Sequence, residues 1–320
     1  MFPIGQHVSK LSGYAPALPT PFHADGSFDA FSFERYCDRQ ILDGANALVV
    51  CGTTGEAPTL TPAEHHKIVS IAARVSQCRV PVIAGAGSNS TSHAIELTKD
   101  AEAAGADAIL STVPYYNKPT QAGLYAHFRA IAEATPLPVI LYDVPSRSAC
   151  GLSDDTIARL AELPQIIGLK DATGDVTRLA RLRPRVGEHF RLLSGDDATA
   201  LAYFTQGGNG CISVTANLAP GLCRDMFLAC RQGQIGRAQR LDEPVAQLTA
   251  MLFRESNPGP LKYALSLLGL MSPAVRLPLV QPSEDTQGEI RNALSQICHG
   301  YQAQMIGKYE EPTVELRRMA

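Results

Sequence analysis

The chain has 320 residues, of which 45% are hydrophobic and 18% are charged, and its formal net charge is −3 at pH 7. This hydrophobic content excludes an intrinsically disordered chain. The slightly negative charge excludes the basic surface that is typical of nucleic-acid-binding proteins. No stretch approaches 18 consecutive apolar residues, so no segment is predicted to span a membrane.

Eight cysteines are spread along the chain, with no C-x-x-C pair and no histidine at zinc-ligand spacing beside them. They are too few for a disulfide scaffold, and the N-terminal sequence MFPIGQHVSK has no apolar core of a secretion signal. We therefore expect a cytoplasmic protein whose cysteines are mostly small buried side chains. These cysteines are Cys37, Cys51, Cys78, Cys150, Cys211, Cys223, Cys230 and Cys298.

Short apolar runs recur along the first 230 residues, separated by helix-like stretches. The runs are continuous rather than alternating, which is typical of parallel strands buried on both faces. One of the helices is predicted to begin at Thr61, because Pro62 and Glu64 complete an N-cap and a capping box. The runs cover residues 15–18, 47–51, 80–84, 108–112, 138–142, 166–169, 192–194 and 210–214.

Eight strand–helix units predict an α/β fold, a (β/α)8 TIM barrel over residues 12–230. A doubly wound dinucleotide-binding sheet requires G-x-G-x-x-G after its first strand. The run 85–90 has no third glycine and follows the third strand, so we interpret it as a turn. Residues 231–300 are predicted to form a C-terminal helical segment on the barrel, with helices over 241–253, 260–270 and 289–297. Residues 301–320 are predicted to form a charged tail.

Catalytic groups of such barrels project from the C-terminal ends of the strands. Lys170 is the one lysine that ends an apolar strand in this sequence. Burial there favours the neutral amine, which can attack a ketone or aldehyde and form a Schiff base. The alternative is a structural lysine paired with Asp171 or Asp143, and the position of Lys170 leaves both interpretations open.

Other strand ends carry groups that suit a small carboxylate substrate. Thr53 and Thr54 offer hydroxyls and turn N–H groups, Tyr116 and Tyr142 are potential proton donors, and Arg147 could bind a carboxylate with two hydrogen bonds. Each also has an ordinary structural explanation, namely a turn cap, a core aromatic ring or a surface arginine.

No metal centre is predicted. Glu64, His65 and His66 do not form the H-E-x-x-H zinc motif. Asp196 and Asp197 are expected to cap the helix after the seventh strand rather than to bind an ion.

Six strand-end segments together resemble the dihydrodipicolinate synthase family, in the pyruvate-dependent class I aldolase superfamily that also includes N-acetylneuraminate lyase. The resemblance covers residues 12–295. It implies a lyase that condenses pyruvate with aspartate semialdehyde to 4-hydroxy-tetrahydrodipicolinate in lysine and diaminopimelate biosynthesis, without a metal or organic cofactor. The segments are 52–56 (GTTGE), 114–119 (PYYNKP), 142–147 (YDVPSR), 168–174 (GLKDATG), 193–197 (LSGDD) and 210–214 (GCISV).

The resemblance also implies catalytic roles. Lys170 would form the imine with pyruvate, and Tyr142 would donate and accept protons. Thr53 would link Tyr142 to Tyr116 in a proton relay, with Tyr116 supplied by a neighbouring subunit of a homotetramer built as a dimer of dimers.

Four further positions are implied to bind the substrates. Thr54 and adjacent backbone N–H groups would hold the pyruvate carboxylate, and Arg147 would hold the carboxylate of aspartate semialdehyde. Gly195 and the backbone of Ile212 would line the pyruvate pocket.

The sequence departs from the family at a cleft where lysine inhibits some members. His65, Asn89 and Tyr115 match the family, but His93 stands where a glutamate binds the amine of the inhibitor. The family histidine at position 62 is replaced by proline. We expect weak or absent inhibition by lysine, because the missing carboxylate removes a charge-assisted contact.

Two other functions stay open at this stage. One is a paralogous aldolase or dehydratase for another aldehyde or sugar acid. Arg147 argues against it, whereas Asp143 favours it because asparagine is common there and a carboxylate is expected to add charge near the site mouth. The other is a catalytically silent barrel, which is disfavoured by the four intact residues Lys170, Tyr142, Thr53 and Tyr116.

Overall fold

The computed structural model describes residues 11–305, with side chains up to residue 295. The seven cysteines between residues 11 and 295 are free, and Cys37, Cys51, Cys211 and Cys223 are buried. Cys298, whose burial was also expected, lies outside the residues whose side chains are described. Among the described helices, none combines the length and the apolar character that a bilayer crossing requires.

Eight parallel strands form one sheet in the order β1-β8-β7-β6-β5-β4-β3-β2. The sheet closes on itself, because Ala17 bridges Val49 in parallel and the Leu18 N–H donates to the Val49 carbonyl at 2.8 Å. The predicted (β/α)8 barrel is confirmed. The strands are β1 (Gly13–Pro16), β2 (Leu48–Val50), β3 (Val82–Gly85), β4 (Ala108–Thr112), β5 (Val139–Asp143), β6 (Ile166–Asp171), β7 (Arg191–Ser194) and β8 (Gly210–Ser213).

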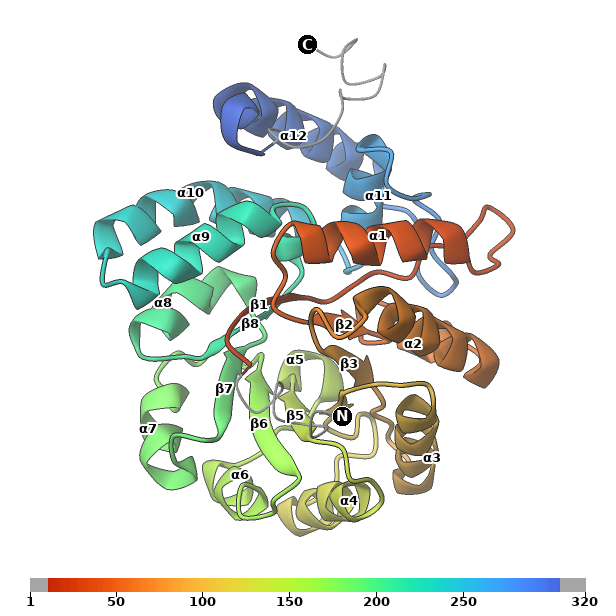
Figure 1. Ribbon diagram of the computed structural model, residues 1–320, viewed down its shortest axis with the longest axis vertical. Coiled ribbons are helices and arrows are strands. Elements are labelled where there is room, and N and C mark those ends of the chain that lie inside the picture. Colours follow the sequence, from red (N-terminus) through yellow and green to blue (C-terminus); the bar gives the residue numbers. More distant parts are fainter. Residues whose placement is uncertain (1–10, 306–320) are drawn as a thin grey trace.

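Eight helices follow the strands in turn and surround the barrel (Figure 1). The predicted capping box is confirmed, since the Glu64 N–H donates to Thr61 Oγ1 and the Thr61 N–H donates to Glu64 Oε2. The helices are α1 (Ala30–Leu42), α2 (Pro62–Ser76), α3 (Thr91–Ala103), α4 (Gln121–Glu133), α6 (Asp154–Leu160), α7 (Arg178–Val186), α8 (Ala200–Thr205) and α9 (Pro220–Arg231); the short α5 (Pro145–Ser148) precedes α6.

Three C-terminal helices follow α9. The first packs against α9, and the other two pack against it and against each other (Figure 1). The three helices are α10 (Ile235–Leu252), α11 (Gly259–Leu267) and α12 (Glu284–Met305). The bounds differ from the predicted ones. The first turns of α10 are polar, so apolar periodicity placed its start too late, at residue 241. Residues 301–305, which were assigned to a tail, continue α12.

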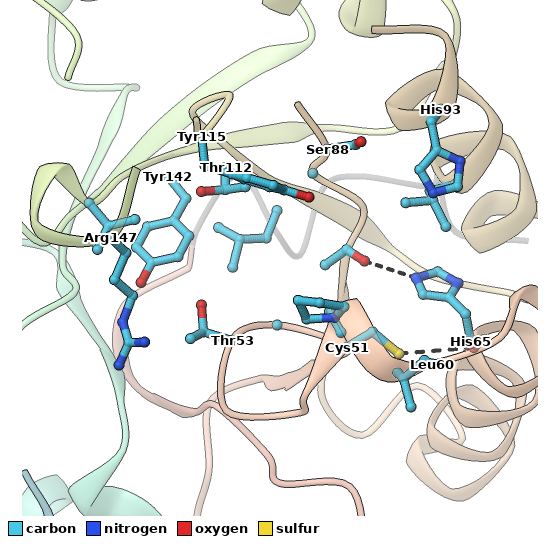
Figure 2. A pocket seen from close by; sticks show the side chains of 18 of the residues that line it. Cys51, Thr53, Leu60, His65, Ser88, His93, Thr112, Tyr115, Tyr142 and Arg147 are labelled. Carbon is cyan, nitrogen blue, oxygen red and sulfur yellow. Dashed lines mark hydrogen bonds between the residues drawn. The ribbon is translucent and has the colours of Figure 1, made fainter. Parts of the chain in front are cut away.

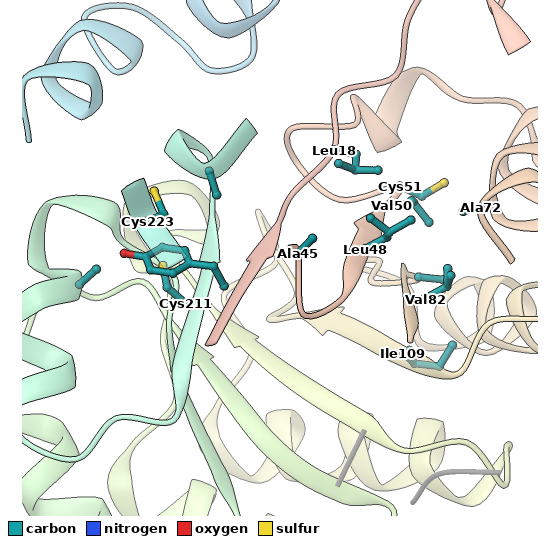
Figure 3. Close-up of a cluster of buried hydrophobic side chains, with 14 of the residues drawn as sticks. Leu18, Ala45, Leu48, Val50, Cys51, Ala72, Val82, Ile109, Cys211 and Cys223 are labelled. Carbon is teal, nitrogen blue, oxygen red and sulfur yellow. The ribbon is translucent and has the colours of Figure 1, made fainter. Parts of the chain in front are cut away.

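The core has two layers, because successive strand residues face opposite sides of the sheet. Val49 and Ile83 lie in a cluster inside the barrel, while Leu48 and Val50 pack outward against the helices (Figure 3). The same alternation at the end of β5 turns Tyr142 into the barrel, where it belongs to the inner cluster. The polar groups that matter for chemistry therefore meet at the C-terminal ends of the strands.

Candidate active site

Lys170 and Tyr142 lie side by side at the C-terminal ends of β6 and β5. They are register partners in the sheet, and the Lys170 Nζ lies 4.1 Å from the centre of the Tyr142 ring. Both are buried, with exposed fractions of 7% and 8%. A primary amine and a phenol are thus held together inside the barrel, away from bulk water.

The neighbouring strands β7 and β8 supply the rest of this enclosure. A Cβ atom at Gly195 would lie 2.9 Å from Lys170 Cγ and 3.0 Å from its Cε. Position 195 must therefore be glycine for the lysine stem to pass. Ile212, on β8, is buried in the same inner cluster as Tyr142.

Lys170 is not the structural ion-pair lysine that the sequence left open. Among the described residues it forms no ion pair with Asp143 or Asp171. Both carboxylates face the outside of the barrel and meet Arg178, at 2.8 and 3.5 Å. Asp143 has no exposed surface, and burial raises the pKa of its carboxyl group. The expectation that Asp143 adds charge near the site mouth is wrong, because strand alternation points its side chain away from the site.

The turn after β2 carries the two predicted threonines. Thr53 lines the main cavity, whereas Thr54 is buried and its hydroxyl accepts a hydrogen bond from Asn257 Nδ2 at 2.9 Å. Asn257 precedes α11 in the C-terminal segment. Sequence reasoning missed this residue because nothing local connects it to a turn that is 203 residues away.

Lys262 was also missed. It has no exposed surface and pairs with the equally buried Glu56 at 2.6 Å. Burial lowers the pKa of Lys262 to about 8. The signal in the sequence is a lone charge in the apolar stretch GPLKYALSL of α11.

Arg147 and Tyr116 are the two exposed members of the predicted catalytic and substrate-binding residues. Arg147 lies on the short α5 and lines the cavity. Tyr116 follows β4 with a left-handed φ of 71° and leaves 86% of its surface exposed. Within one chain, Tyr116 is not among the residues that line the cavity.

A cavity of about 430 Å³ extends from the strand ends toward α2 and α3. Figure 2 shows Thr53, Tyr142 and Arg147 at one side of it, and His65 and His93 at the other. Tyr115 lies between these two ends. Of the predicted inhibitor cleft, Asn89 is the member outside the lining, and it hydrogen-bonds Asn117 nearby.

The histidines at the far end of the cavity already have partners. His65 Nε2 lies 2.9 Å from the Gly85 carbonyl oxygen, and His93 Nδ1 lies 3.5 Å from Glu96 Oε2. No aspartate or glutamate of the described residues lines the cavity.

The acidic pair after β7 has divided roles. Asp196 caps the following turn at the Ala198 N–H, as predicted. Asp197 instead accepts the N–H groups of Val214 and Thr215, at 2.8 and 2.9 Å. The prediction that Asp197 caps the helix is wrong, because its buried carboxylate instead binds the backbone of the loop that follows β8. The described residues contain no group of three or more histidine, cysteine or acidic side chains that could hold a metal ion.

Comparison with known proteins identifies the family. The model of the dihydrodipicolinate synthetase family matches residues 10–297. A 4-hydroxy-tetrahydrodipicolinate synthase of Methylobacterium radiotolerans is 50% identical over 286 residues, which cover 89% of this chain and 95% of the relative. The synthase of Gluconobacter oxydans is 49% identical over 286 residues, covering 89% and 96%.

Solved structures agree in fold and in sequence. The chloride-inhibited dihydrodipicolinate synthase of Acinetobacter baumannii, in complex with pyruvate, superposes with a TM-score of 0.87 at 46% identity and covers 89% of this chain and 98% of its own. The lysine-bound synthase of Cyanidioschyzon merolae gives a TM-score of 0.87 at 38% identity, covering 89% and 97%. The chain belongs to the dihydrodipicolinate synthetase family.

Proposed function

We propose that this protein is the lyase that condenses pyruvate with aspartate semialdehyde to 4-hydroxy-tetrahydrodipicolinate, in lysine and diaminopimelate biosynthesis. Relatives of that name match nearly the whole chain at about half identity. The observation that carries the proposal within the molecule is Lys170, buried 4.1 Å from the Tyr142 ring at the strand ends.

Lys170 is the proposed nucleophile. Its amine attacks the keto carbon of pyruvate, and loss of water gives an imine. A proton then leaves the methyl group, and the resulting enamine attacks the aldehyde carbon of the second substrate. The amine of that substrate closes the ring by replacing Lys170 at the former keto carbon, so the enzyme is regenerated without a metal or organic cofactor.

Proton transfer is the proposed task of Tyr142, Thr53 and Tyr116. The hydroxyl that leaves as water in imine formation needs a proton, and the phenol of Tyr142 lies beside Lys170, with its ring centre 4.1 Å from Nζ. Thr53 faces the same cavity and would pass protons toward Tyr116. Because Tyr116 is 86% exposed in one chain, we propose that it completes the relay of a neighbouring subunit.

The two substrate carboxylates have different proposed partners. Thr54, with the N–H groups of its turn, would bind the pyruvate carboxylate deep in the barrel, where Gly195 and Ile212 enclose the small substrate. Arg147, exposed at the cavity, would bind the carboxylate of aspartate semialdehyde.

The testing experiment is a coupled assay with pyruvate and aspartate semialdehyde, in which the NADPH-dependent reductase consumes the product. We expect turnover that disappears in Lys170→Ala, together with borohydride-stable labelling by pyruvate in the unaltered protein alone. Lys67→Ala, an exposed lysine on α2, is the matched control and should retain both.

The assay also separates the alternatives. Labelling by pyruvate without turnover would move the function to another aldehyde or sugar acid. Neither labelling nor turnover would contradict the imine mechanism altogether. We further propose a cytoplasmic homotetramer. A trans position of Tyr116 requires at least a dimer, the family resemblance implies a dimer of dimers, and both proposed substrates are soluble metabolites.

A further inference from the structure

The turn that carries Thr54 depends on contacts from elsewhere in the chain. Glu56, at its end, has a left-handed φ of 56°, which is costly for a residue with a Cβ atom. The turn itself supplies two backbone hydrogen bonds, from the Glu56 N–H to Thr53 at 3.1 Å and from the Ala57 N–H to Gly52 at 3.2 Å. Such a turn keeps one geometry when its surroundings hold it.

The C-terminal segment supplies this support at three atoms. Asn257 Nδ2 donates to Thr54 Oγ1 at 2.9 Å. Lys262 Nζ and the Arg276 N–H donate to the two carboxylate oxygens of Glu56, at 2.6 and 2.9 Å. The helices appended to the barrel thus reach the floor of the site through the residues around α11.

Lys262 and Glu56 form the rigid base of this arrangement. Neither side chain is exposed, and Lys262 Nζ also lies 4.2 Å from the centre of the Phe22 ring, which Arg276 approaches from 4.1 Å. A buried charge without its partner is strongly unfavourable. The pair therefore fixes the Glu56 end of the turn and, through it, the place of Thr54.

Asn257 acts on the hydroxyl of Thr54 directly. A hydroxyl has a single hydrogen to donate. Because Thr54 Oγ1 accepts the Asn257 N–H, its own hydrogen is free to point elsewhere, and a carboxylate is an acceptor only. The contact therefore prepares Thr54 as a donor to an anion.

The burial of Asn257 leaves one of its polar atoms without a partner. Its side chain is 5% exposed, and its Oδ1 is buried without a hydrogen-bond partner among the described residues. A buried polar atom left unpaired costs free energy. Its one side-chain hydrogen bond within the described part of the chain goes to Thr54.

We propose that Asn257 is a positioning residue for pyruvate, which orients the Thr54 hydroxyl toward the substrate carboxylate from the C-terminal segment. This inference rests on the proposed function, since it takes Thr54 as the ligand of that carboxylate. Under this proposal, the segment around α11 contributes a positioning residue to the active site of the barrel.

The test reverses the direction of the hydrogen bond. In Asn257→Asp the new carboxylate cannot donate and instead accepts the Thr54 hydrogen, which turns away from the substrate. We expect KM for pyruvate to rise roughly ten- to a hundredfold. Because the lost contact is made equally in the ground and transition states, kcat and KM for aspartate semialdehyde should stay nearly unchanged.

Two comparisons separate positioning from a general structural effect. Asn209→Asp makes the same chemical change next to the opposite end of β8, where its oxygen already accepts Leu192 N–H and Arg183, and should leave KM unchanged. In a double-mutant cycle with Thr54→Val, adding Asn257→Asp should cause no further loss, since Asn257 acts through the hydroxyl that Thr54→Val removes.

The outcomes are distinct. A KM for pyruvate within twofold of the unaltered protein, or additive losses in the cycle, would overturn the inference. If Asn257→Asp does not fold, Asn257→Ala removes the donor without a new charge, and its KM decides in the same way. Pyruvate labelling of the unaltered protein is measured first, so that failure of the proposed function is recognised independently of Asn257.

Discussion

Two lysines show how burial alone does not define a chemical role. Lys262 is more buried than Lys170, with 0% against 7% of its surface exposed. Lys262, however, pairs with a carboxylate, whereas Lys170 faces a phenol ring. The ion pair ties the Lys262 amine to Glu56, whereas the Lys170 amine stands at the C-terminal ends of the strands beside the Tyr142 phenol. Lys170 is therefore the lysine placed for nucleophilic attack.

Gly195 offers a test of how tightly the lysine stem is held. In Gly195→Ala the new Cβ would lie 2.9–3.0 Å from two carbons of Lys170, and the amine must shift. We expect kcat/KM to fall roughly a hundredfold, as for a displaced reacting group, with the fold retained in thermal unfolding.

Gly236→Ala, on α10, is the matched control for this change. Its Cβ would meet Arg240 Nη1 at an ordinary 3.8 Å, so steady-state kinetics should be unaltered. Equal effects of the two substitutions would contradict the role assigned to position 195.

His93 decides the expected response to lysine. It lines the far end of the cavity, and no aspartate or glutamate of the described residues belongs to that lining; Glu96, 3.5 Å from His93, lies outside it. We expect inhibition by lysine to be weak, and His93→Glu to strengthen it roughly ten- to a hundredfold through a charge-assisted contact. Inhibition constants measured for both proteins check this.

The same charge placed outside the cavity provides the control. His66→Glu changes a residue of the neighbouring α2 that is not part of the lining, and its inhibition should match that of the unaltered protein. An inhibition constant for lysine in the low micromolar range, measured on the unaltered protein, would contradict the expectation.

At the scale of elements, the alternation of side chains along β5 and β6 separates the proposed catalytic residues from the structural carboxylates. Their paired ends place Tyr142 and Lys170 inside the barrel and Asp143 and Asp171 outside it. The outer carboxylates bind Arg178 of α7, which also pairs with Asp154 of α6 at 3.2 Å. The charges that surround the site thus anchor two helices to the strand ends without entering the cavity.

Helix α4 carries a buried histidine that makes stability sensitive to acid. Burial lowers the pKa of His127 to about 4, whereas in the unfolded chain it is about 6.5. The unfolded state therefore takes up a proton first as the pH falls, and the folded state loses up to about 3 kcal/mol between pH 6.5 and 4.

We expect His127→Gln to remove this part of the pH dependence, measured by urea unfolding at pH 7 and at pH 4.5. Gln retains a polar group for Thr91, which lies 2.9 Å from His127 Nδ1, but it does not titrate. His189→Gln, at an exposed position, should leave the dependence as it is. A steep acid loss that persists in His127→Gln would show that another group is responsible.

At the scale of the whole molecule, the proposed relay through Tyr116 predicts that one chain is not a complete catalyst. Its ring is 86% exposed and does not line the cavity of its own chain. If the relay is completed between subunits, Tyr116→Phe and Lys170→Ala should each be inactive or nearly so, while their co-assembled mixture regains activity. In the mixture, Lys170→Ala chains supply Tyr116 to sites that still contain Lys170.

Sedimentation of the mixture and of each parent checks this prediction with the coupled assay. Activity is expected in oligomers alone. A fully active monomer, or a mixture no more active than its parents, would place Tyr116 outside the relay.

Most of the barrel was predictable because its signals are local. Buried parallel strands appear as continuous apolar runs, and helix starts such as Thr61 with Glu64 carry their own capping chemistry. Helix bounds in the C-terminal segment were less accurate, since the polar first turns of α10 give little apolar periodicity. The same local reasoning singled out Lys170, Tyr142 and Thr53 as strand-end residues, whereas their proposed roles came from the family resemblance.

The sequence by itself determined the barrel, the order of its units and the group of side chains at its C-terminal rim, because each depends on residues close together in the chain. The tertiary structure decided what those side chains meet. It turned Asp143 and Asp171 away from Lys170 and toward Arg178, and it brought Asn257 to Thr54 across 203 residues. Side-chain direction and long-range contact follow from sheet alternation and from the packing of distant segments, which no local pattern encodes.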